Sequence, residues 1–590
     1  MKKIMSGNEA FAYGAYLAGI NVAAAYPGTP STEILDNFSK YSGVYAEWST
    51  NEKVALDVGI GAAYAGGRAL VTMKHVGMNV AADSLFYISY TGMKGGLVII
   101  NADDPSMHSS QNEQDNRHYA RFAKVPMLEP ADSEEAKQSV KAALEISEKF
   151  DTPVIIRTTT RLSHSLSIVE TEDEPVAESL SEPVAFERNP VKYVMVPAFA
   201  RQRHPVVEDR LKKLAVMAET TALNRIEPGD DEIGVIVSGV AYQYAREVFP
   251  NATFLKLGMV YPLPAGLIKE LAGRVKQVVV IEELDPFIEE HVRLMGIPAR
   301  GKDIFPNIGE FNPGLLRRCA QEAGLISGSV QSTPAVSVPQ LPGRPPMLCP
   351  GCGHRGLFYA LQRVKALVHG DIGCYTLGSA PPLSAMHTSG CMGASIGVVH
   401  GVDKVGVKDR TVAVIGDSTF FHSGVAPLIN LHYNNGTSTV IVADNRVTAM
   451  TGHQANPGTG STLMGIESPV VKIDELARGI GFKKVDVVNP YDFKTMVDTI
   501  KDHLQSKEPS VIVAQYPCVL YKRERKPALV VDLEKCNECG NCLRIACSPI
   551  TKVEGGVSIN AALCIGCGFC ATICNQGAIG LPNREGGTEQ

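Results

Sequence analysis

The stretch Thr411-Val412-Ala413-Val414-Ile415-Gly416-Asp417-Ser418 sets the fold class of this chain. A short apolar run rich in β-branched residues ends in a Gly-Asp-Ser turn, which is typical of a buried strand in a parallel sheet. A second run of this kind, residues 439–443, leads directly into Asp444 and Asn445. The two runs predict strands of an α/β domain whose polar side chains gather at the carboxyl ends of the strands.

Similar buried runs recur in the first part of the chain. The strands that we expect there lie at residues 22–25, 69–72, 97–100 and 153–156. Helical patterns at 51–64 and 133–149 separate them, as an α/β layer domain requires. The whole chain then divides into an α/β domain over 1–165, a linker and helical spacer over 166–229, a second α/β domain over 230–325, a Pro-rich linker over 326–346, a third α/β domain over 347–525 and a Cys-rich tail over 527–585.

The composition excludes several classes of protein. The chain has 590 residues, of which 45% are hydrophobic and 20% charged, which is ordinary for a folded multidomain protein. A formal net charge of -6 gives no basic field for a nucleic-acid partner. Because no run approaches about 18 uninterrupted apolar residues, we also expect no membrane partner.

The first residues superficially imitate an export signal. Met1-Lys2-Lys3 precedes an Ala-rich region, but Asn8, Glu9 and Gly14 interrupt the supposed apolar segment. We therefore expect a buried first helix that leads into a strand, and a cytoplasmic protein.

Eight of the fourteen cysteines fall in the tail and form two similar motifs, Cys536-x2-Cys539-x2-Cys542-x4-Cys547 and Cys564-x2-Cys567-x2-Cys570-x3-Cys574. In two-cluster ferredoxins the fourth cysteine of each motif serves the other cluster. The expected ligands of one [4Fe-4S] cluster are Cys536, Cys539, Cys542 and Cys574. Those of the other are Cys564, Cys567, Cys570 and Cys547.

Two features of the tail depart from the ferredoxin pattern. The first motif has four residues before Cys547 instead of three, and the second has Asn575 where proline is usual. Two structural zinc sites remain the alternative, because zinc also binds pairs of cysteines two residues apart. Two triple-Cys runs favour the iron–sulfur interpretation.

The turns after residues 411–415 and 439–443 predict a metal site. A carboxylate from Asp417 and a carboxamide from Asn445 at neighbouring strand ends can hold one Mg²⁺, whose remaining ligands come from phosphate oxygens. The upstream segment Ser389–Ser395, which contains Met392 and Gly393, offers small residues and backbone N–H groups for those phosphates.

This arrangement resembles the thiamine diphosphate motif, a Gly-Asp-Gly followed after about 25 residues by Asn-Asn. Here Gly416 and Asp417 are retained, Ser418 replaces the second glycine and Asp444 replaces the first asparagine. The resemblance implies that the Val447 carbonyl is a third protein ligand of the metal.

Further segments resemble the alpha subunits of the indolepyruvate branch of the 2-oxoacid:ferredoxin oxidoreductases. Tyr26-Pro27-Gly28-Thr29-Pro30 matches the family's substrate loop and implies that Thr29 contacts the substrate carboxylate. Residues 49–55 match the segment with the cofactor-activating glutamate, here Glu52. Residues 348–354 match the opening of the diphosphate domain. The implied fold is a multidomain α/β protein with thiamine-diphosphate-binding parallel sheets, a transketolase-C-terminal-like domain and a C-terminal two-cluster ferredoxin-like α+β module.

The resemblance also implies an activity. It is the oxidative decarboxylation of aryl 2-oxoacids, such as indolepyruvate and phenylpyruvate, to aryl-acetyl-CoA, with electrons passing through iron–sulfur clusters to ferredoxin. The cofactors are thiamine diphosphate, Mg²⁺ and two [4Fe-4S] clusters. The partners are coenzyme A, ferredoxin and a smaller gamma-type beta subunit in an (alpha-beta)2 assembly. The alternatives are a subunit for pyruvate or another 2-oxoacid, a non-oxidative thiamine-dependent decarboxylase, and an electron-transfer subunit alone.

Four further cysteines, Cys349, Cys352, Cys374 and Cys518, match the proximal-cluster ligands of related pyruvate enzymes. A third [4Fe-4S] cluster is therefore a hypothesis, and its alternatives are a zinc site, a turn, or buried thiols that act as small apolar residues.

Arg117 and Arg121 could assist carboxylate recognition, but their spacing of one helical turn is typical of a solvated face.

Overall fold

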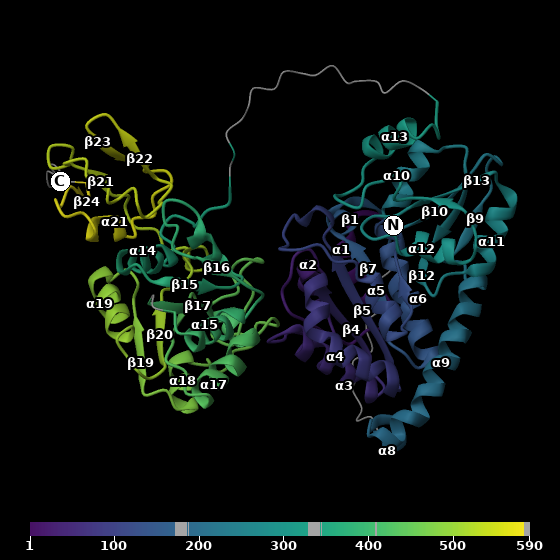
Figure 1. The fold of residues 1–590 in the computed structure, drawn as a ribbon, viewed down its shortest axis with the longest axis horizontal. Helices are drawn as coiled ribbons and strands as arrows, with labels where there is room; N and C mark the ends of the chain where they lie inside the picture. Colours follow the sequence, from purple (N-terminus) through teal and green to yellow (C-terminus); the bar gives the residue numbers. More distant parts are fainter. Residues whose placement is uncertain (172–185, 187, 328–342, 344, 408–409, 583–590) are drawn as a thin grey trace. The chain divides into compact units, whose positions relative to one another are not determined.

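The chain is described by a computed structural model that covers residues 1–171, 186, 188–327, 343, 345–407 and 410–582. It consists of two compact units, Met1–Ser337 and Val338–Gln590 (Figure 1). Most of the Pro-rich linker predicted over 326–346 lies outside the described residues, as do residues 172–185 of the predicted spacer. Within the described residues, no helix combines the length and the apolar character of a membrane span.

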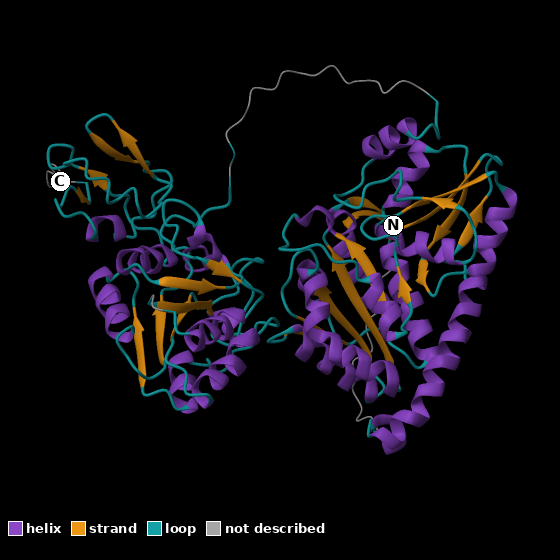
Figure 2. Ribbon diagram, viewed as in Figure 1, coloured by secondary structure: helices purple, strands orange, loops and turns teal. Residues whose placement is uncertain are grey.

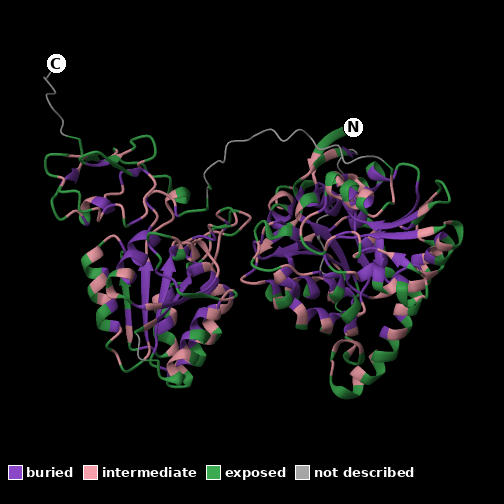
Figure 3. Cartoon of the chain, turned by 45° about the horizontal axis from the view of Figure 1, so that its top comes forward, coloured by how far each residue is buried: buried purple, intermediate pink, exposed green. Residues whose placement is uncertain are grey.

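A seven-stranded sheet with the order β12-β6-β7-β5-β4-β2-β3 forms the centre of the first unit. All neighbouring pairs from β6 to β3 are parallel, and every residue of β5 is buried (Figure 3). The strands are β2 (Val22–Ala25), β3 (Tyr45–Trp48), β4 (Arg68–Lys74), β5 (Gly96–Asp103), β6 (Met127–Leu128), β7 (Val154–Thr159) and β12 (Met259–Tyr261). The four strands predicted in this part of the sequence are therefore confirmed to within one residue at their starts.

Helices cover this sheet (Figure 2). They are α1 (Gly7–Leu17), α2 (Thr32–Phe38), α3 (Glu52–Tyr64), α4 (His75–Thr91), α5 (Arg117–Ala123), α6 (Ser133–Phe150) and α7 (Thr160–His164). The predicted helices α3 and α6 are confirmed, and each begins at a polar cap. Asn51 accepts a hydrogen bond from the Val54 N–H, and Asp132 accepts one from the Glu135 N–H.

The start of the chain differs from the expectation of a first helix. β1 (Lys2–Ser6) precedes α1 and pairs antiparallel with β8 (Leu166–Glu170). The sequence did not indicate this ribbon, because the partner strand lies more than 150 residues away and both strands are largely exposed.

The second sheet of the first unit has the order β14-β13-β10-β11-β9. Its strands are β9 (Arg225–Glu227), β10 (Ile233–Ser238), β11 (Thr253–Leu257), β13 (Gln277–Ile281) and β14 (Ala299–Arg300). The helices of this part are α8 (Pro190–Tyr193), α9 (Pro197–Thr220), α10 (Ala241–Val248), α11 (Ala265–Arg274), α12 (Phe287–Leu294) and α13 (Pro313–Glu322). This part is less separate than the sequence suggested, because β12 adds to the first sheet through β6 and one apolar core runs through both parts.

The second unit contains a six-stranded parallel sheet with the order β16-β15-β17-β18-β20-β19. Its strands are β15 (Leu367–Gly370), β16 (Thr388–Ser389), β17 (Thr411–Gly416), β18 (Thr439–Asp444), β19 (Lys484–Val488) and β20 (Ser510–Gln515). Its main helices are α14 (His354–Val364), α15 (Ala394–Val405), α17 (Val425–Tyr433), α18 (Ile473–Ile480) and α19 (Phe493–His503). The two runs that set the fold class are adjacent strands, as predicted.

The Cys-rich tail forms two short antiparallel ribbons and a single helical turn. β21 (Val530–Val531) pairs with β24 (Ile579–Gly580), β22 (Ile550–Val553) pairs with β23 (Gly556–Ile559), and α21 spans Phe569–Thr572. The tail packs on the parallel sheet domain of the same unit, where the rings of Phe569 and Tyr491 stack with centroids 5.0 Å apart. The buried Arg355 side chain donates to the main-chain carbonyls of Ile545 and Ala546 and so joins α14 to the tail.

Candidate active site

Asp417 lies at the carboxyl end of β17, where its carboxylate is 2% exposed. It accepts a hydrogen bond from Asn456 Nδ2 at 2.9 Å and others from the N–H groups of Ser418 and Asn445. Burial, and after it the nearby Asp444 carboxylate, raises the pKa of Asp417 to about 7. In the described part of the chain no lysine or arginine forms an ion pair with this carboxylate. A buried carboxylate beside another acid is stabilised by a bound cation.

Asp444 is compensated by its own neighbours. Its carboxylate accepts hydrogen bonds from the Arg446 N–H at 3.0 Å and from Gln515 Nε2 at 2.9 Å. The Arg446 guanidinium also lies 3.1 Å from it. Asp417 is therefore the carboxylate of this pair that is available to a metal ion.

The loop after β18 brings the remaining predicted ligands to the same place. The Asn445 side-chain oxygen accepts a hydrogen bond from the Val447 N–H at 3.1 Å, across Arg446 in the left-handed conformation with φ 68°. Ser418 Oγ lies 2.7 Å from Thr448 Oγ1 and joins this loop to the turn after β17. The structure thus brings Asp417, Ser418, Asn445 and Val447 together.

The segment predicted to bind phosphate lies at the amino end of α15, a helix of twelve residues. Gly393 immediately precedes it with φ 84°, and a Cβ at this position would lie 2.6 Å from the Ser423 Cβ. A Cβ on Gly416 would lie 2.7 Å from the Tyr375 ring. Only glycine fits these close approaches, and Met392 is half-buried beside them. In this structure the Ser395 N–H of that helix terminus donates to the buried Asp371 carboxylate at 3.2 Å. A helix terminus close to a buried carboxylate at a neighbouring strand end is the kind of place where a diphosphate is held through a divalent cation.

In the first unit, Glu52 and Thr29 lie at the carboxyl edge of the first sheet. Glu52 is the first residue of α3 and is 5% exposed, and its carboxylate packs against α4. A Cβ on Gly77 would lie only 2.8 Å from Glu52 Oε1, so this glycine leaves room for the carboxylate. Thr29 is half-buried after β2, and its main-chain oxygen accepts a hydrogen bond from Ser109 Oγ at 3.3 Å.

The first predicted cysteine quartet, Cys536, Cys539, Cys542 and Cys574, lines one small cavity of the tail. Burial, and then the thiols of the other three cysteines, raises the pKa of Cys542. Crowded neutral thiols of this kind are stabilised as thiolates when a metal binds.

The second quartet, Cys564, Cys567, Cys570 and Cys547, is also brought together. Burial, and then the thiols of the other three, raises the pKa of Cys570 to about 12. Cys542 of the first quartet contributes as well, so the two quartets are neighbours. The extra residue before Cys547 therefore does not remove its thiol from the group.

The third set, Cys349, Cys352, Cys374 and Cys518, gathers between the tail and the turns around Asp417. Burial, and then the thiols of Cys518 and Cys349, raises the pKa of Cys374 to about 11, and Asp417 adds to the effect. Burial and then Cys374 and Cys349 raise the pKa of Cys352 to about 12. The Cys518 N–H donates to the Asn445 carbonyl at 3.0 Å, so this set contacts the predicted metal site directly.

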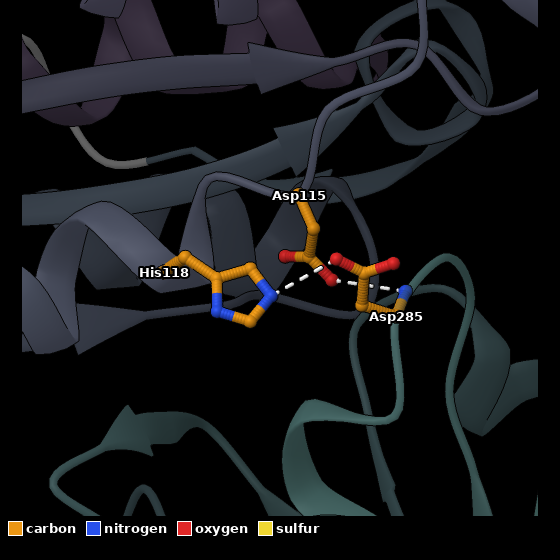
Figure 4. Close-up of side chains that lie close together, drawn as sticks. All are labelled: Asp115, His118 and Asp285. Carbon is orange, nitrogen blue, oxygen red and sulfur yellow. Dashed lines mark hydrogen bonds and ion pairs between the residues drawn. The ribbon is translucent and has the colours of Figure 1, made fainter.

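The interpretation of Arg117 as a solvated residue is wrong. Its side chain is 1% exposed, with its guanidinium 2.5 Å from both Asp115 and Glu282, whereas Arg121 one turn later is exposed. Three potential metal ligands lie next to Arg117, with one ligand atom each from Asp115, His118 and Asp285 within 4.8 Å of one another (Figure 4). Asp115 is nevertheless committed to Arg117, and His118 pairs with Asp285 at 2.9 Å, so the group is an ion-pair network.

Sequence reasoning missed two polar residues of these edges. Asn456 reaches Asp417 from 39 residues away, and no motif marks it. Lys74, the last residue of β4, is buried next to the Thr29 loop. Only the fold brings either residue to its place.

Comparison with known proteins identifies the family. Residues 13–227 match the family described as pyruvate flavodoxin/ferredoxin oxidoreductase, thiamine diP-bdg, and residues 371–514 match the thiamine pyrophosphate enzyme, C-terminal TPP binding domain. The protein named indolepyruvate oxidoreductase subunit IorA from Archaeoglobus fulgidus is 42% identical over 98% of this chain and 97% of its own length. The chain belongs to the IorA family.

Two further IorA proteins support this membership. Those of Methanothermobacter thermautotrophicus and Pyrococcus horikoshii are 42% and 41% identical, each over 98% of this chain and at least 96% of their own length. Among solved structures, the chain resembles a 2-oxoglutarate:ferredoxin oxidoreductase from Magnetococcus marinus with 2-oxoglutarate, coenzyme A and succinyl-CoA bound. The alignment covers 54% of this chain and 65% of that chain, at 16% identity and a TM-score of 0.46. This likeness is too partial to bear on the site. This IorA-family chain is thus a subunit of a thiamine-diphosphate-dependent 2-oxoacid oxidoreductase.

Proposed function

We propose that this chain catalyses the oxidative decarboxylation of aryl 2-oxoacids such as indolepyruvate and phenylpyruvate. One 2-oxoacid, one coenzyme A and two oxidised ferredoxins give an acyl-CoA, carbon dioxide, one proton and two reduced ferredoxins. The observation that carries this proposal is the identity of about 40% over nearly the whole chain to proteins named after indolepyruvate.

The residues of the two sheet edges take defined roles in this proposal. Asp417, Asn445 and the Val447 carbonyl hold Mg²⁺, while Gly416, Ser418, Met392 and Gly393 surround the diphosphate. Thiamine diphosphate, when bound, supplies the nucleophilic carbon and the electron sink of the reaction. The buried Glu52 carboxylate would stabilise the imino tautomer of the aminopyrimidine ring, which takes up the proton of the reacting carbon. Thr29 would donate a hydrogen bond to the substrate carboxylate.

The two quartets of the tail would each hold a [4Fe-4S] cluster, and the third set of cysteines would hold another if that hypothesis is correct; such clusters would supply one-electron carriers between the cofactor and ferredoxin. The set of Cys349, Cys352, Cys374 and Cys518 contacts the metal site through Cys518 and Asn445, and a cluster held there would supply the acceptor nearest to the cofactor. Tyr491 lies near both that set and the next one, because burial and then the thiols of Cys567 and Cys352 raise the pKa of its hydroxyl. Cys570 and Cys542 then link the two quartets of the ferredoxin-like tail. Zinc in these positions would leave the electrons without a path, which favours iron–sulfur clusters.

Several partners follow from the proposed reaction. Coenzyme A accepts the acyl group and ferredoxin accepts the electrons. We further propose a smaller beta subunit, in line with relatives that are named as subunits of an oxidoreductase. An (alpha-beta)2 assembly and a cytoplasmic location are further parts of the proposal.

The test is anaerobic co-production with the smaller subunit of the same host, followed by methyl viologen reduction. Indolepyruvate, phenylpyruvate, pyruvate and 2-oxoglutarate are compared with and without coenzyme A. Reduction with the aryl acids alone, and only with coenzyme A, is the expected result. Carbon dioxide release without dye reduction would indicate a non-oxidative decarboxylase, and no product from any acid would indicate an electron-transfer subunit.

The proposed metal site has its own test in Asp417→Asn. The variant keeps the shape of the side chain and its contact with Asn456, but it removes the charge that attracts Mg²⁺. We expect loss of thiamine diphosphate from the purified complex while its iron content stays unchanged. Retention of the cofactor at the wild-type level would contradict the site.

A further inference from the structure

Lys74 carries a buried positive charge that the protein does not neutralise. The residue ends β4 and is 8% exposed, and its Nζ donates a hydrogen bond to the Ser109 carbonyl at 2.6 Å. In the described part of the chain no carboxylate lies within ion-pair distance of this ammonium. Burial lowers the pKa of Lys74 to about 8, and the more distant Asp104 offsets this only in part. A buried ammonium without a counter-ion is unfavourable unless an anion binds beside it.

The nearest acid is occupied by neutral donors. The Asp104 carboxylate accepts hydrogen bonds from the Ser109 N–H at 2.9 Å, from Ser110 Oγ at 2.5 Å and from Thr160 Oγ1 at 2.6 Å. Burial alone would raise the pKa of Asp104, but these three donors lower it more than Lys74 does, since Lys74 adds only a weaker attraction without an ion pair. The ammonium therefore keeps positive charge, and two of its three N–H donors, for another group.

Lys74 also lies where the substrate is proposed to bind. A Cβ on Gly28 would approach the Lys74 Cβ to 3.0 Å, so the loop that carries Thr29 packs directly on Lys74. Ser109 joins the two residues, because its carbonyl accepts from Lys74 and its hydroxyl donates to the Thr29 carbonyl. The helix that begins after Lys74 packs through Gly77 against Glu52.

We propose that Lys74 binds the carboxylate of the 2-oxoacid and, with Thr29, fixes that end of the substrate. This assignment rests on the proposed function and adds a specificity to it. The substrate must present a free carboxylate, whereas the corresponding amides and esters lack the charge that compensates the ammonium. A charge-assisted hydrogen bond of this kind corresponds to about a 10- to 100-fold difference in affinity.

The test compares three variants of the complete complex. Lys74→Met removes the charge, Lys74→Arg keeps it, and Lys137→Met is the matched control. Lys137 is equally buried in the same unit and lies on α6, but its charge is compensated: it donates to the Glu170 carbonyl at 2.7 Å and pairs with Glu134 at 2.8 Å. For each variant, KM is measured for phenylpyruvate and for coenzyme A. Anaerobic calorimetry gives the affinities of phenyllactate and of phenyllactamide, which share one skeleton but carry a charged carboxylate and a neutral carboxamide.

We expect Lys74→Met to raise KM for phenylpyruvate about 10- to 100-fold and to leave KM for coenzyme A unchanged. It should also abolish the preference for phenyllactate over phenyllactamide, which Lys74→Arg should largely restore. Lys137→Met should alter none of these values.

Two results would overturn the assignment. One is a Lys74→Met complex that still prefers the acid over the amide as the wild type does. The other is an equal loss of affinity for both ligands, which would mean that Lys74 only fastens the loop through Ser109. If the wild-type complex oxidised no 2-oxoacid, the proposed function would fail, but the calorimetric comparison would still decide the role of Lys74.

Discussion

Replacement of Arg117 by methionine should destabilise the first unit strongly, although the proposed reaction gives this residue no role. The guanidinium donates to Asp115, to Glu282 and to the main-chain carbonyls of Glu283 and Asp285 at 3.0 and 2.9 Å. Removing it leaves two buried carboxylates without their main cation; Arg157 stays 3.9 Å from Asp115, and Lys302 acts on Glu282 from a greater distance. Breaking a buried pair in this way costs about 3–5 kcal/mol.

This cost translates into a measurable melting shift. The first unit, Met1–Ser337, has 337 residues, and an unfolding entropy of roughly 2.1 cal/mol/K per residue gives about 0.7 kcal/mol/K. The unfolding temperature should therefore fall by about 4–7 °C in anaerobic calorimetry of the complex at pH 8. Arg121→Met, one helical turn away and exposed, is the matched control and should shift it by less than about 1 °C.

The effect should depend on pH in a defined direction. Burial alone would raise the pKa of Asp115, but Arg117 and Arg157 hold it well below its usual value. A carboxyl group with a lowered pKa contributes stability above its unfolded pKa, and that contribution is lost as the pH falls. The difference between wild type and Arg117→Met should therefore shrink in acid, as the stranded carboxylates take up protons.

A second set of substitutions checks the same reasoning. Adding Asp115→Asn and Glu282→Gln to Arg117→Met removes the stranded charges and should recover part of the lost stability, since buried networks tolerate complete neutral replacement better than partial loss. The assignment of Arg117 to a buried ion network would be refuted by either of two results. One is an unfolding temperature of Arg117→Met equal to that of Arg121→Met, and the other is a loss of stability in Arg117→Met that does not depend on pH.

Three further outcomes are expected. Gly393→Ala should weaken thiamine diphosphate binding and lower the unfolding temperature of the second unit, because the added Cβ would lie 2.6 Å from the Ser423 Cβ and a φ of 84° is strained for alanine. Equilibrium dialysis measures the affinity and calorimetry the unfolding temperature. A wild-type affinity would contradict the placement of the diphosphate beside Gly393. The ratio kcat/KM for phenylpyruvate should be constant up to about pH 8 and fall above it, since Lys74, which faces Asp104 and His75, must stay protonated. In Lys74→Arg that fall should be absent, and a fall at the same pH would assign it to another group. Cys542→Ser should lower the iron content by up to four atoms per chain while thiamine diphosphate is retained; an unchanged iron content would argue against the first quartet.

The parts of the site that could be predicted from the sequence are those encoded locally. Asp417 and Asn445 follow two apolar runs, and parallel strands bring their carboxyl ends to one edge whatever the rest of the chain does. The cysteines of the tail are likewise set by short spacings within one segment. Strands β4 and β5 could be predicted for the same reason, because full burial makes them continuous apolar runs.

The parts that could not be predicted depend on distant segments. Arg117 lies in a short helix with another arginine one turn on, and this pattern is the same for a solvated and a buried residue. Its buried environment is made by Asp115, two residues earlier, and by Glu282, 165 residues later. β1 is exposed and short, so its pairing with β8 leaves no hydrophobic pattern to detect. In each case the physical cause is a partner that the local sequence does not contain.

Charge compensation separates the buried ionic residues of this protein into two kinds. Arg117 has carboxylates and carbonyls around it, so its charge is fully used by the fold and no ligand is needed to explain it. Asp417 and Lys74 are also buried, at 2% and 8% exposed, yet neither has an oppositely charged side chain within ion-pair distance in the described residues. Burial without compensation is unfavourable in the free protein, and the binding of an ion of opposite sign removes that cost. The same argument thus leads to a cation at Asp417 and to an anion at Lys74, and these are the two charges that a metal-bound diphosphate cofactor and a 2-oxoacid bring.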